Sequence, residues 1–499
     1  MATDASARAR IRCCVVGVGN CASALLQGLV FYRDAAPAGE AATAAVPATR
    51  PGLGSPGFAP DAAPARALAA HGGLMRAEIG GYRVGDVDVV LAFDVDARKV
   101  GRPVREAIVA PPNCCFAFAA SDCDAPVLLA PLLDGVAPQV ASPPADAARG
   151  VVVHADAAGA AAPTLAALTA AVVRERCDVL INYLPVGSQV ATELWANVAI
   201  AAGCAMVNCI PVFIASSAAW EAKFVAARLP IIGDDMKSQF GASIVSQMLQ
   251  ELALDRGHVV RAHIQQNSGG NTDFFNMTDR ARLASKKISK ENVIGSINDI
   301  VGVPRESSFL FAGPSDYVRP EFARSRCSAP PLLLRTRPRP HRYPPGALLR
   351  RPQDRDIPPR ARGLRRRARR LRRQARRAGE REPVTQSAAP AYLVQPSETR
   401  GVSAASASAN SRPRSPPPPP RPQDSPNSAG VVIDAIRYVQ VARELGIVGA
   451  LRGPSAFTQK SPPVPLRFRD ALDECNALAD RRLTATTAKQ VAKPSAARE

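Results

Sequence analysis

Three lysines fall within six positions of this 499-residue chain, in the stretch SKKISK at residues 285–290. The chain has no further lysine between Lys290 and Lys460. Lys286 and Lys290 are four positions apart, so on a helix they share one face and can reach a single small molecule. A lysine can stabilise a developing oxyanion, and when its pKa is depressed it can also exchange a proton, as arginine cannot. For such a pair taken alone a solvated helix face is the more ordinary interpretation, and catalysis is the alternative that the rest of the sequence has to support.

A glycine turn near the start of the chain offers a second kind of chemistry. The stretch IRCCVVGVGNCASALLQGLVFY predicts a strand from Ile11, a tight turn and a helix. Gly17, Gly19 and Ala22 form the G-x-G-x-x-A pattern, in which the glycines let the backbone approach a pyrophosphate and the alanine lets the helix pack closely. Helix N-terminal amides then face the phosphates. The pattern predicts a dinucleotide site, although glycine turns between strands and helices are also common without one.

A second strand, in VDVVLAFDVDARKVG, ends in acidic residues. In a compact dinucleotide-binding unit the ribose-binding acid lies about 20 residues beyond the glycines. Residues 35–70 are rich in Ala, Pro and Gly without a period, so we interpret them as an inserted loop that lengthens this spacing. Asp94, the first acid after the apolar run, is the preferred ribose ligand, and Asp96 is the alternative.

Three further apolar runs, CDVLINYLPVG, AMVNCIPVF and PIIGDDM, alternate with helix-like spans such as SQVATELWANVAIAAG. This alternation predicts an α/β fold with a parallel sheet. Ligands bind at the carboxyl ends of such strands. Position therefore makes site candidates of the polar and glycine residues that follow the runs, although for any single one a turn residue or a helix cap is the more ordinary interpretation; they are Gly187, Ser188, Asn208, Asp234 and Asp235. The later stretch SPNSAGVVIDAIRYVQVARELG predicts a capped amphipathic helix.

The basic charge of the chain is concentrated in one segment. Residues 319–423 contain 26 arginines, no lysine and six acidic residues, and so hold the whole formal net charge of +20. Their Arg/Pro/Ala/Ser texture shows no strand alternation and is typical of disorder. Phosphate contacts to a nucleic acid or an anionic membrane are the alternative function, but aromatic residues for base stacking are lacking. We therefore predict no specific nucleic-acid partner.

The cysteines and the apolar runs bear on location. The 11 cysteines are scattered without a C-x-x-C motif, and most lie in apolar runs, which favours free thiols in a reducing compartment. A strand pattern beginning at Ile11 leaves no room for a signal peptide, and no apolar run reaches membrane-spanning length. A cytoplasmic protein with no membrane insertion is expected.

Taken together, the motifs resemble the inositol-3-phosphate synthase (myo-inositol-1-phosphate synthase) family, most nearly its actinobacterial type. The resemblance covers about residues 11–34, 72–318 and 424–465. Ten ordered blocks carry it, which is far more specific than one glycine motif: VGVGNCASALLQG, AFDVDARKVG, YLPVGS, VNCIPVFIAS, PIIGDDMKSQFGA, GGNTDFFNM, SKKISK, GPSDYV, DSPNSAGVVIDA and QKSPP.

The resemblance implies an NAD-dependent isomerase that converts D-glucose 6-phosphate to 1D-myo-inositol 3-phosphate without net redox change, as the first step of inositol and phosphatidylinositol biosynthesis. C5 is oxidised, an enolate forms, an intramolecular aldol reaction closes the ring and the ketone is reduced again. The family is typically homotetrameric. An oxidoreductase with net turnover of its cofactor is the alternative enzyme class, and would need a different substrate site.

The predicted site residues combine the glycine turn, the strand ends and the segments matched to the family. Catalytic roles are expected for Lys286, Lys290, Lys460, Asp235 and Lys237. Cofactor contacts are expected at Gly17, Gly19, Asn20, Cys21, Ala22, Asp94, Pro185, Gly187, Ser188, Asn208, Asp235, Ser238, Asp424 and Ser425. Substrate contacts are expected at Asn271, Thr272, Asp273, Lys286, Lys290, Asp316 and Lys460. No metal ligand set is predicted.

The chain departs from the family after GPSDYV. The family has a further active-site lysine and the strands of its second domain there, where this chain has residues 319–423. We interpret that segment as a gene-model or frameshift artefact, or as an insertion that replaced core strands. In the second case the chain is a catalytically impaired NAD-binding homologue with an anion-binding segment. The predicted organisation is an NAD-binding domain of the Rossmann type at 1–262, the first part of an α+β substrate and oligomerisation domain at 263–318, the Arg/Pro-rich segment at 319–423, a return to the first domain at 424–483 and a disordered tail at 484–499.

Overall fold

The computed structural model describes residues 10–34, 73–141, 150–260, 263–295, 305–311, 315–323, 327–328 and 424–483. The insertion predicted at 35–70, the tail at 484–499 and most of the segment 319–423 lie outside the described residues. All the described residues belong to one compact unit, which comprises Met1–Pro330 and Pro396–Glu499. The other unit, Pro331–Gln395, lies wholly outside them.

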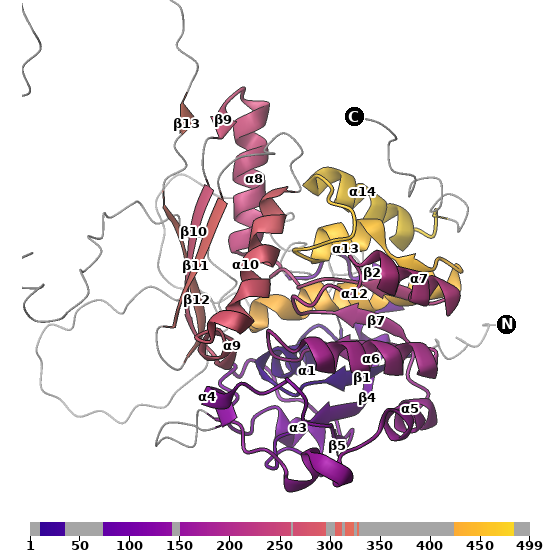
Figure 1. Ribbon diagram of the computed structural model, residues 1–499. Helices are drawn as coiled ribbons and strands as arrows, with labels where there is room; N and C mark the ends of the chain where they lie inside the picture. The colour runs from indigo at the N-terminus through magenta and orange to yellow at the C-terminus, as the bar shows by residue number, and fades with distance from the viewer. Residues whose placement is uncertain are drawn as a thin grey trace, which may run out of the picture. The chain divides into compact units, whose positions relative to one another are not determined.

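A seven-stranded parallel sheet forms the centre of this unit (Figure 1). Its order is β14-β8-β7-β6-β1-β4-β5, so the chain runs outward from β1 in one direction and then returns to β6 on the other side, as in doubly wound dinucleotide-binding folds. The predicted α/β fold class is confirmed. The strands are β1 (Ile11–Val16), β4 (Val87–Asp94), β5 (Val127–Leu129), β6 (Val179–Asn182), β7 (Ala205–Asn208), β8 (Pro230–Ile232) and β14 (Gly449–Ala450).

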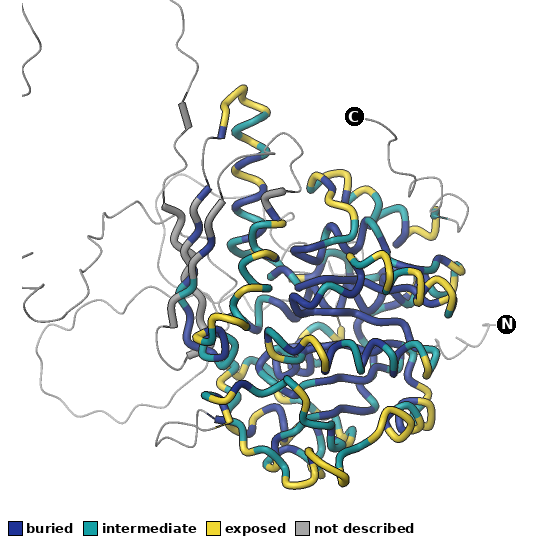
Figure 2. The backbone as a smooth tube through the Cα atoms, viewed as in Figure 1, coloured by how far each residue is buried: buried dark blue, intermediate teal, exposed yellow. Residues whose placement is uncertain are grey.

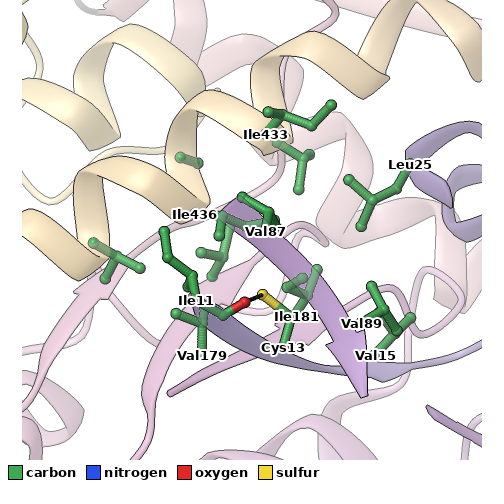
Figure 3. Packing of buried hydrophobic residues seen from close by; sticks show 14 of the residues in the cluster. Ile11, Cys13, Val15, Leu25, Val87, Val89, Val179, Ile181, Ile433 and Ile436 are labelled. Atoms are coloured by element: carbon green, nitrogen blue, oxygen red, sulfur yellow. Dashed lines mark hydrogen bonds between the residues drawn. The ribbon is translucent and has the colours of Figure 1, made fainter. Parts of the chain in front are cut away.

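Helices cover both faces of the sheet. Alternate residues of β1 point to opposite faces, so Cys13 and Val15 pack in one core with Leu25, whereas Cys14 and Val16 pack in the other with Trp195. Figure 3 shows the first core, in which helix side chains lie against strand side chains. Burial on both sides explains why the strands read as continuous apolar runs. The helices are α1 (Asn20–Phe31) and α12 (Pro426–Glu444) on one face, and α5 (Leu165–Arg174), α6 (Gln189–Ala202) and α7 (Ala218–Ala226) on the other.

The helix predicted for SPNSAGVVIDAIRYVQVARELG is confirmed as α12, but the prediction that it is capped and amphipathic was wrong. Ser425, at its N-cap position, makes no side-chain hydrogen bond to the helix end. Residues on all sides of α12 are buried, because the helix packs against α1, against β7 and β8, and against α14 (Phe468–Ala479). In Figure 2 its tube is almost wholly in the colour of buried residues. A helix covered on several sides needs no polar face.

A second, three-stranded sheet has the order β11-β10-β12. Its central strand β10 (His263–Gly270) pairs in parallel with β11 (Arg305–Phe311) and antiparallel with β12 (Ser315–Ala323). Three helices belong with it: α8 (Ala242–Asp255), α9 (Thr272–Asn276) and α10 (Arg280–Gly295). The last of these confirms that Lys286 and Lys290 lie on a helix.

β12 continues through residues 319–323, which the sequence had placed in the segment without strand pattern. Cys327–Ser328 (β13) then pairs with Val259–Val260 (β9). Main-chain pairing with β10 does not depend on side-chain alternation, and Pro320 is compatible with it because β12 is an edge strand. The first residues after position 318 are therefore strand residues.

Two further observations concern the whole described part of the chain. None of its helices combines the length and the apolar character that crossing a bilayer requires. The cysteines whose side chains are described are all free thiols, and most of them are buried.

Candidate active site

A cavity of ≈ 240 Å³ lies at the carboxyl edge of the seven-stranded sheet. Residues at the ends of β1, β4, β6 and β7 line it, among them Val16, Asp94, Tyr183 and Cys209. The strand order reverses between β1 and β6, and such a switch point is where open α/β sheets bind ligands. Residues from α10 and from the segment before α12 also line the cavity.

The glycine turn lies at one end of this cavity. Gly17 has φ +89°, and a Cβ there would come within 2.7 Å of the Tyr183 carbonyl oxygen, so only glycine is accommodated. A Cβ on Gly19 would meet nothing within 4 Å, so open space lies over the turn. Helix α1 begins at Asn20, and its first amides face that space. Ala22 is fully buried in the core between α1 and the sheet.

Asp94 ends β4 beside this turn. Its Oδ2 accepts a hydrogen bond from the Val18 amide at 2.8 Å, and its Oδ1 accepts from the amides of Val95 and Asp96. Asp96, the alternative, is fully buried and paired with Arg98 at 2.5 Å, away from the cavity lining. Of the two acids, only Asp94 lines the cavity.

Two residues near Asp94 were missed by the sequence reasoning. Lys99 is buried and lines the cavity, and its Nζ donates to the Val18 carbonyl at 2.8 Å and to Asn113 Oδ1 at 3.0 Å. Asn113 Nδ2 donates to the same carbonyl at 3.0 Å. The main-chain N–H and C=O of Val18 are therefore both hydrogen-bonded to side chains. The only sequence signal was the position of Lys99 in DVDARKVG, just beyond the acidic strand end.

Asp235 is the centre of the lysine cluster. Its carboxylate is 1% exposed, and its Oδ1 accepts from Lys286 Nζ at 3.0 Å and from Lys460 Nζ at 2.9 Å. Ser289, one turn beyond Lys286 on α10, donates to Oδ2 at 2.5 Å. Burial alone would raise the pKa of Asp235, but the two ammonium groups and the serine outweigh it and lower this pKa to about 2. The carboxylate is therefore ionised and holds two cations at one point.

Main-chain pairing brings Lys460 to Asp235. The Lys460 amide donates to the Asp235 carbonyl at 2.7 Å, and the Lys237 amide donates to the Thr458 carbonyl at 2.8 Å. Met236 and Gln459 form an antiparallel bridge between these two hydrogen bonds. The segments DDMK and TQK thus run side by side although more than 200 residues separate them.

The lysines differ in their affinity for a proton. Burial opposes the charged form of Lys286, but Asp235 and Asp273 outweigh it and raise its pKa above the ordinary value. Burial lowers the pKa of Lys237 to about 7, and Lys460 contributes to that shift. Burial, followed by the charges of Lys460 and Lys286, likewise lowers the pKa of Lys290 to about 7. The cluster therefore places Lys286, which stays charged, beside the amines of Lys237 and Lys290, which can gain or lose a proton near neutral pH.

Asp234, the neighbour of Asp235, points away from the cavity into a buried polar network. Its carboxylate accepts from Asn208 Nδ2 at 2.7 Å and from the amide and the hydroxyl of Ser216 at 3.0 and 2.7 Å. Asn208 Oδ1 in turn accepts from Asn182 at 2.9 Å. This network ties the ends of β6 and β7 to the turn that presents Asp235.

Most of the predicted site residues come together around the cavity. Its lining includes Gly17, Gly19, Asn20, Cys21, Asp94, Pro185, Asp235, Lys237, Ser238, Asn271, Thr272, Asp273, Lys286, Asp424, Ser425 and Lys460. Two of them also join the segments before α9 and α12, since Asn271 Nδ2 donates to Asp424 Oδ2 at 2.9 Å. These residues come from widely separated parts of the chain, so the fold assembles them.

Other predicted residues lie outside the lining. Asn208 belongs to the buried network just described, and Ser188 Oγ donates to the Pro185 carbonyl at 2.6 Å at the start of α6. Gly187, with φ +86°, packs against α10. Lys290 lies close enough to Lys460 and Lys286 to feel their charges, but it does not line the cavity. Asp316 lies in β12, and its side chain is outside the described part of the structure.

Within the described residues, no group of three or more His, Cys, Asp or Glu side chains has an arrangement that could hold a metal ion. The absence of a metal ligand set remains a prediction for the chain as a whole.

Comparison with protein families and known relatives gives a consistent result. The sequence profile of the myo-inositol-1-phosphate synthase family matches residues 241–320. The inositol-3-phosphate synthase of Corynebacterium glutamicum is 33% identical over 465 residues, which are 91% of this chain and 94% of that protein. Inositol-3-phosphate synthases of Mycolicibacterium smegmatis and Mycobacterium tuberculosis are also 33% identical, over 91% and 92% of this chain and 94% and 93% of theirs.

Two solved structures share the fold. Ari2 has a TM-score of 0.52 at 23% identity, over 94% of this chain and 99% of that one. A myo-inositol-1-phosphate synthase-related protein from Thermotoga maritima also has a TM-score of 0.52, at 16% identity, over 94% of this chain and 98% of that one. At these identities the likeness concerns the fold alone.

Proposed function

The chain belongs to the inositol-3-phosphate synthase family, and from that premise we propose that it binds NAD in the cavity at the sheet edge and isomerises D-glucose 6-phosphate to 1D-myo-inositol 3-phosphate. The observation that carries the proposal is the buried Asp235 carboxylate, which holds Lys286 and Lys460 together beside amines of depressed pKa. This reaction needs both fixed cations and exchangeable protons at one sugar.

The cavity end around the glycine turn supports NAD as the cofactor. Open space lies over Gly19, the amides of α1 face it, and the Asp94 carboxylate ends the neighbouring strand. The open space and the helix amides suit a pyrophosphate, and the carboxylate suits a ribose diol. Bound there, NAD would supply a reversible acceptor for the hydride of sugar C5. Asn271, Thr272, Asp273, Asp424 and Ser425 line the remainder of the cavity and would contact the cofactor and the substrate.

The lysines have distinct tasks in this proposal. Oxidation at C5 makes the C6 protons acidic. Lys290 is neutral above about pH 7 but lies outside the cavity lining, so in this proposal its amine reaches C6 and takes one of these protons only once the substrate is bound. The resulting C6 carbanion equivalent attacks the C1 aldehyde, so that a C1–C6 bond forms and the aldehyde oxygen becomes an alkoxide. Lys286, which stays charged, is suited to stabilise that oxyanion, and a lysine of low pKa returns the proton. Asp235 keeps two of the ammonium groups in place.

The test is a product assay with purified full-length chain, NAD and D-glucose 6-phosphate. Phosphorylated inositol should accumulate while the absorbance of NADH stays flat. Accumulating NADH would identify a dehydrogenase with net turnover instead. NAD binding without either product would identify an impaired homologue, as expected if residues 319–423 truly replace the family's further lysine. Sequencing the transcript across the codons for residues 318–424 shows whether that replacement exists in the message.

A further inference from the structure

Arg282 lies on α10 four residues before Lys286 and eight before Lys290, so all three side chains emerge from the same side of the helix. Its guanidinium does not reach the cavity lining but points at two loops that form it. Nη1 donates to the Val186 carbonyl at 3.2 Å, and Nη2 donates to the Asp134 carbonyl. Val186 and the residues that follow Asp134, such as Gly135, line the cavity.

The two loops held by Arg282 are themselves hydrogen-bonded to neighbouring helices. The Asp134 carboxylate accepts from the amides of Val190 and Ala191 at 2.8 and 2.9 Å, at the start of α6. The Val186 carbonyl accepts a second hydrogen bond, from Asn276 Nδ2 of α9 at 2.7 Å. Arg282 therefore connects the lysine helix to a rigid platform at the carboxyl edge of the sheet.

Contact between α10 and this platform is unusually close at Gly187. A Cβ there would lie 2.6 Å from Arg282 Cγ and 3.1 Å from its Cα. The backbone of α10 therefore packs directly against the loop at Gly187. The Arg282 guanidinium then reaches the Val186 carbonyl of this loop and the Asp134 carbonyl of the other loop. At the next turns, Lys286 and Ser289 are tied to Asp235. Arg282 lies about 12 Å along the helix axis from Lys290, so it holds the part of α10 that precedes the lysines.

We propose that Arg282 is a positioning residue that clamps α10 onto the 134–135 and 185–187 loops and so fixes where Lys286 and Lys290 stand relative to a ligand on those loops. The proposal deepens the proposed function and rests on it for the identity of that ligand. Without the clamp, α10 is still held by the packing of Leu283 against Val186, Phe274 and Met277, so the fold survives. Its tilt is then no longer set, and a misplacement of about 1 Å can cost roughly 100-fold in rate.

The experiment compares Arg282→Gln with Arg280→Gln, which removes the same charge from an exposed position on the same helix. The pH dependence of Lys290 acetylation by dilute acetic anhydride, followed by mass spectrometry with and without NAD, reports the surroundings of Lys290 directly. In Arg282→Gln the midpoint should move toward that of an ordinary lysine, because a less buried amine holds its proton better. kcat should fall about 10- to 100-fold while NAD affinity changes less than about 3-fold.

Arg280→Gln should match the wild type in all three measurements. Arg282→Lys should give values between those of the wild type and Arg282→Gln, since an ammonium can still donate to one of the two carbonyls. If Arg282→Gln proves too unstable, Gly187→Ala pushes the same contact apart and should produce the same shift at Lys290. An unchanged Lys290 midpoint in the folded variants overturns the proposal. Because this titration needs no sugar, it decides the role of Arg282 even if the wild type makes no inositol phosphate.

Discussion

Asp235 and Lys460 are joined twice: the Lys460 amide donates to the Asp235 carbonyl at 2.7 Å, and Lys460 Nζ donates to the Asp235 carboxylate at 2.9 Å. The main-chain bond fixes where the lysine side chain starts, and the carboxylate fixes where it ends. Lys286 reaches the same oxygen from helix α10. One buried carboxylate therefore holds together the two segments that bring the lysines of this site.

Asp235→Asn tests this arrangement. The amide is nearly isosteric but cannot offset two positive charges, so Lys286 and Lys460 should repel each other and one of them should lose its proton. We expect kcat for inositol phosphate formation to fall at least 100-fold, as for loss of other preorganised electrostatic groups. NAD affinity measured by calorimetry then separates a loss of catalysis from a loss of cofactor binding, because Asp235 is also an expected cofactor contact. Activity within a few-fold of the wild type would show that the carboxylate is dispensable.

The rate should depend on pH through Lys290. Its neutral amine is the proposed base and its pKa is lowered to about 7, so kcat/KM should rise as the pH increases through about 7 and level off above it. Lys290→Arg, which cannot deprotonate, should abolish activity across this range. Lys287→Arg makes the same change three positions earlier on the same helix and should keep the wild-type profile. A profile that falls as pH rises through 7 would assign the lysine the role of an acid instead.

Stability should also depend on pH, and with a defined sign. Lys237 and Lys290 have pKa values of about 7 in the folded protein against an ordinary 10.5, so between these values the unfolded chain binds more protons. The free energy of unfolding should therefore rise with pH from about 7 to 8, by at most about 1.4 kcal/mol per pH unit for each lysine. Above this window the buried cysteines oppose the rise, because burial raises their pKa and the unfolded thiols lose their protons first. Urea denaturation at several pH values measures this slope. Replacing both lysines with methionine should flatten it.

A buried ion pair in α12 should matter for stability. Arg437 is fully buried, donates to the carbonyls of Ala77 and Arg76 at 2.8 and 2.9 Å, and pairs with the buried Asp434. Asp434→Ala leaves the arginine charge buried without its partner and should cost about 3 to 5 kcal/mol in the free energy of unfolding. Asp480→Ala breaks a solvent-exposed pair with Arg76 and should cost far less. Equal losses in chemical denaturation would contradict this account of α12.

Asp94 and Asp96 should separate cofactor binding from folding. Asp94→Ala removes a carboxylate that lines the cavity beside the glycine turn, and should weaken NAD binding by about 10-fold, the size of one charged hydrogen bond. Asp96→Ala removes the buried partner of Arg98 and should lower the melting temperature. Titration of NAD by fluorescence, next to thermal unfolding, distinguishes the two. The assignment fails if the effects are exchanged.

Much of the site could be predicted from local sequence. The turn around Gly17, the acid at the end of β4 and the placement of Lys286 and Lys290 on one helix face all follow from short-range patterns, because strand and helix periodicity fix side-chain direction within a few residues. Matching to the family added residues such as Asn271 and Asp424, for which spacing alone offered no signal.

Tertiary structure decided how these elements meet. Asn208 follows a strand just as a ligand-binding residue would, yet its amide turns into the network with Asn182 and Asp234. Gly187 was predicted as a cofactor contact, and in the structure α10 packs against it. The pairing of Asp235 with Lys460, and the reach of Arg282 to the sheet edge, join segments far apart in the chain. Periodicity determines which way a side chain points from its own element, but which neighbour it meets depends on how distant segments pack, and only folding sets that.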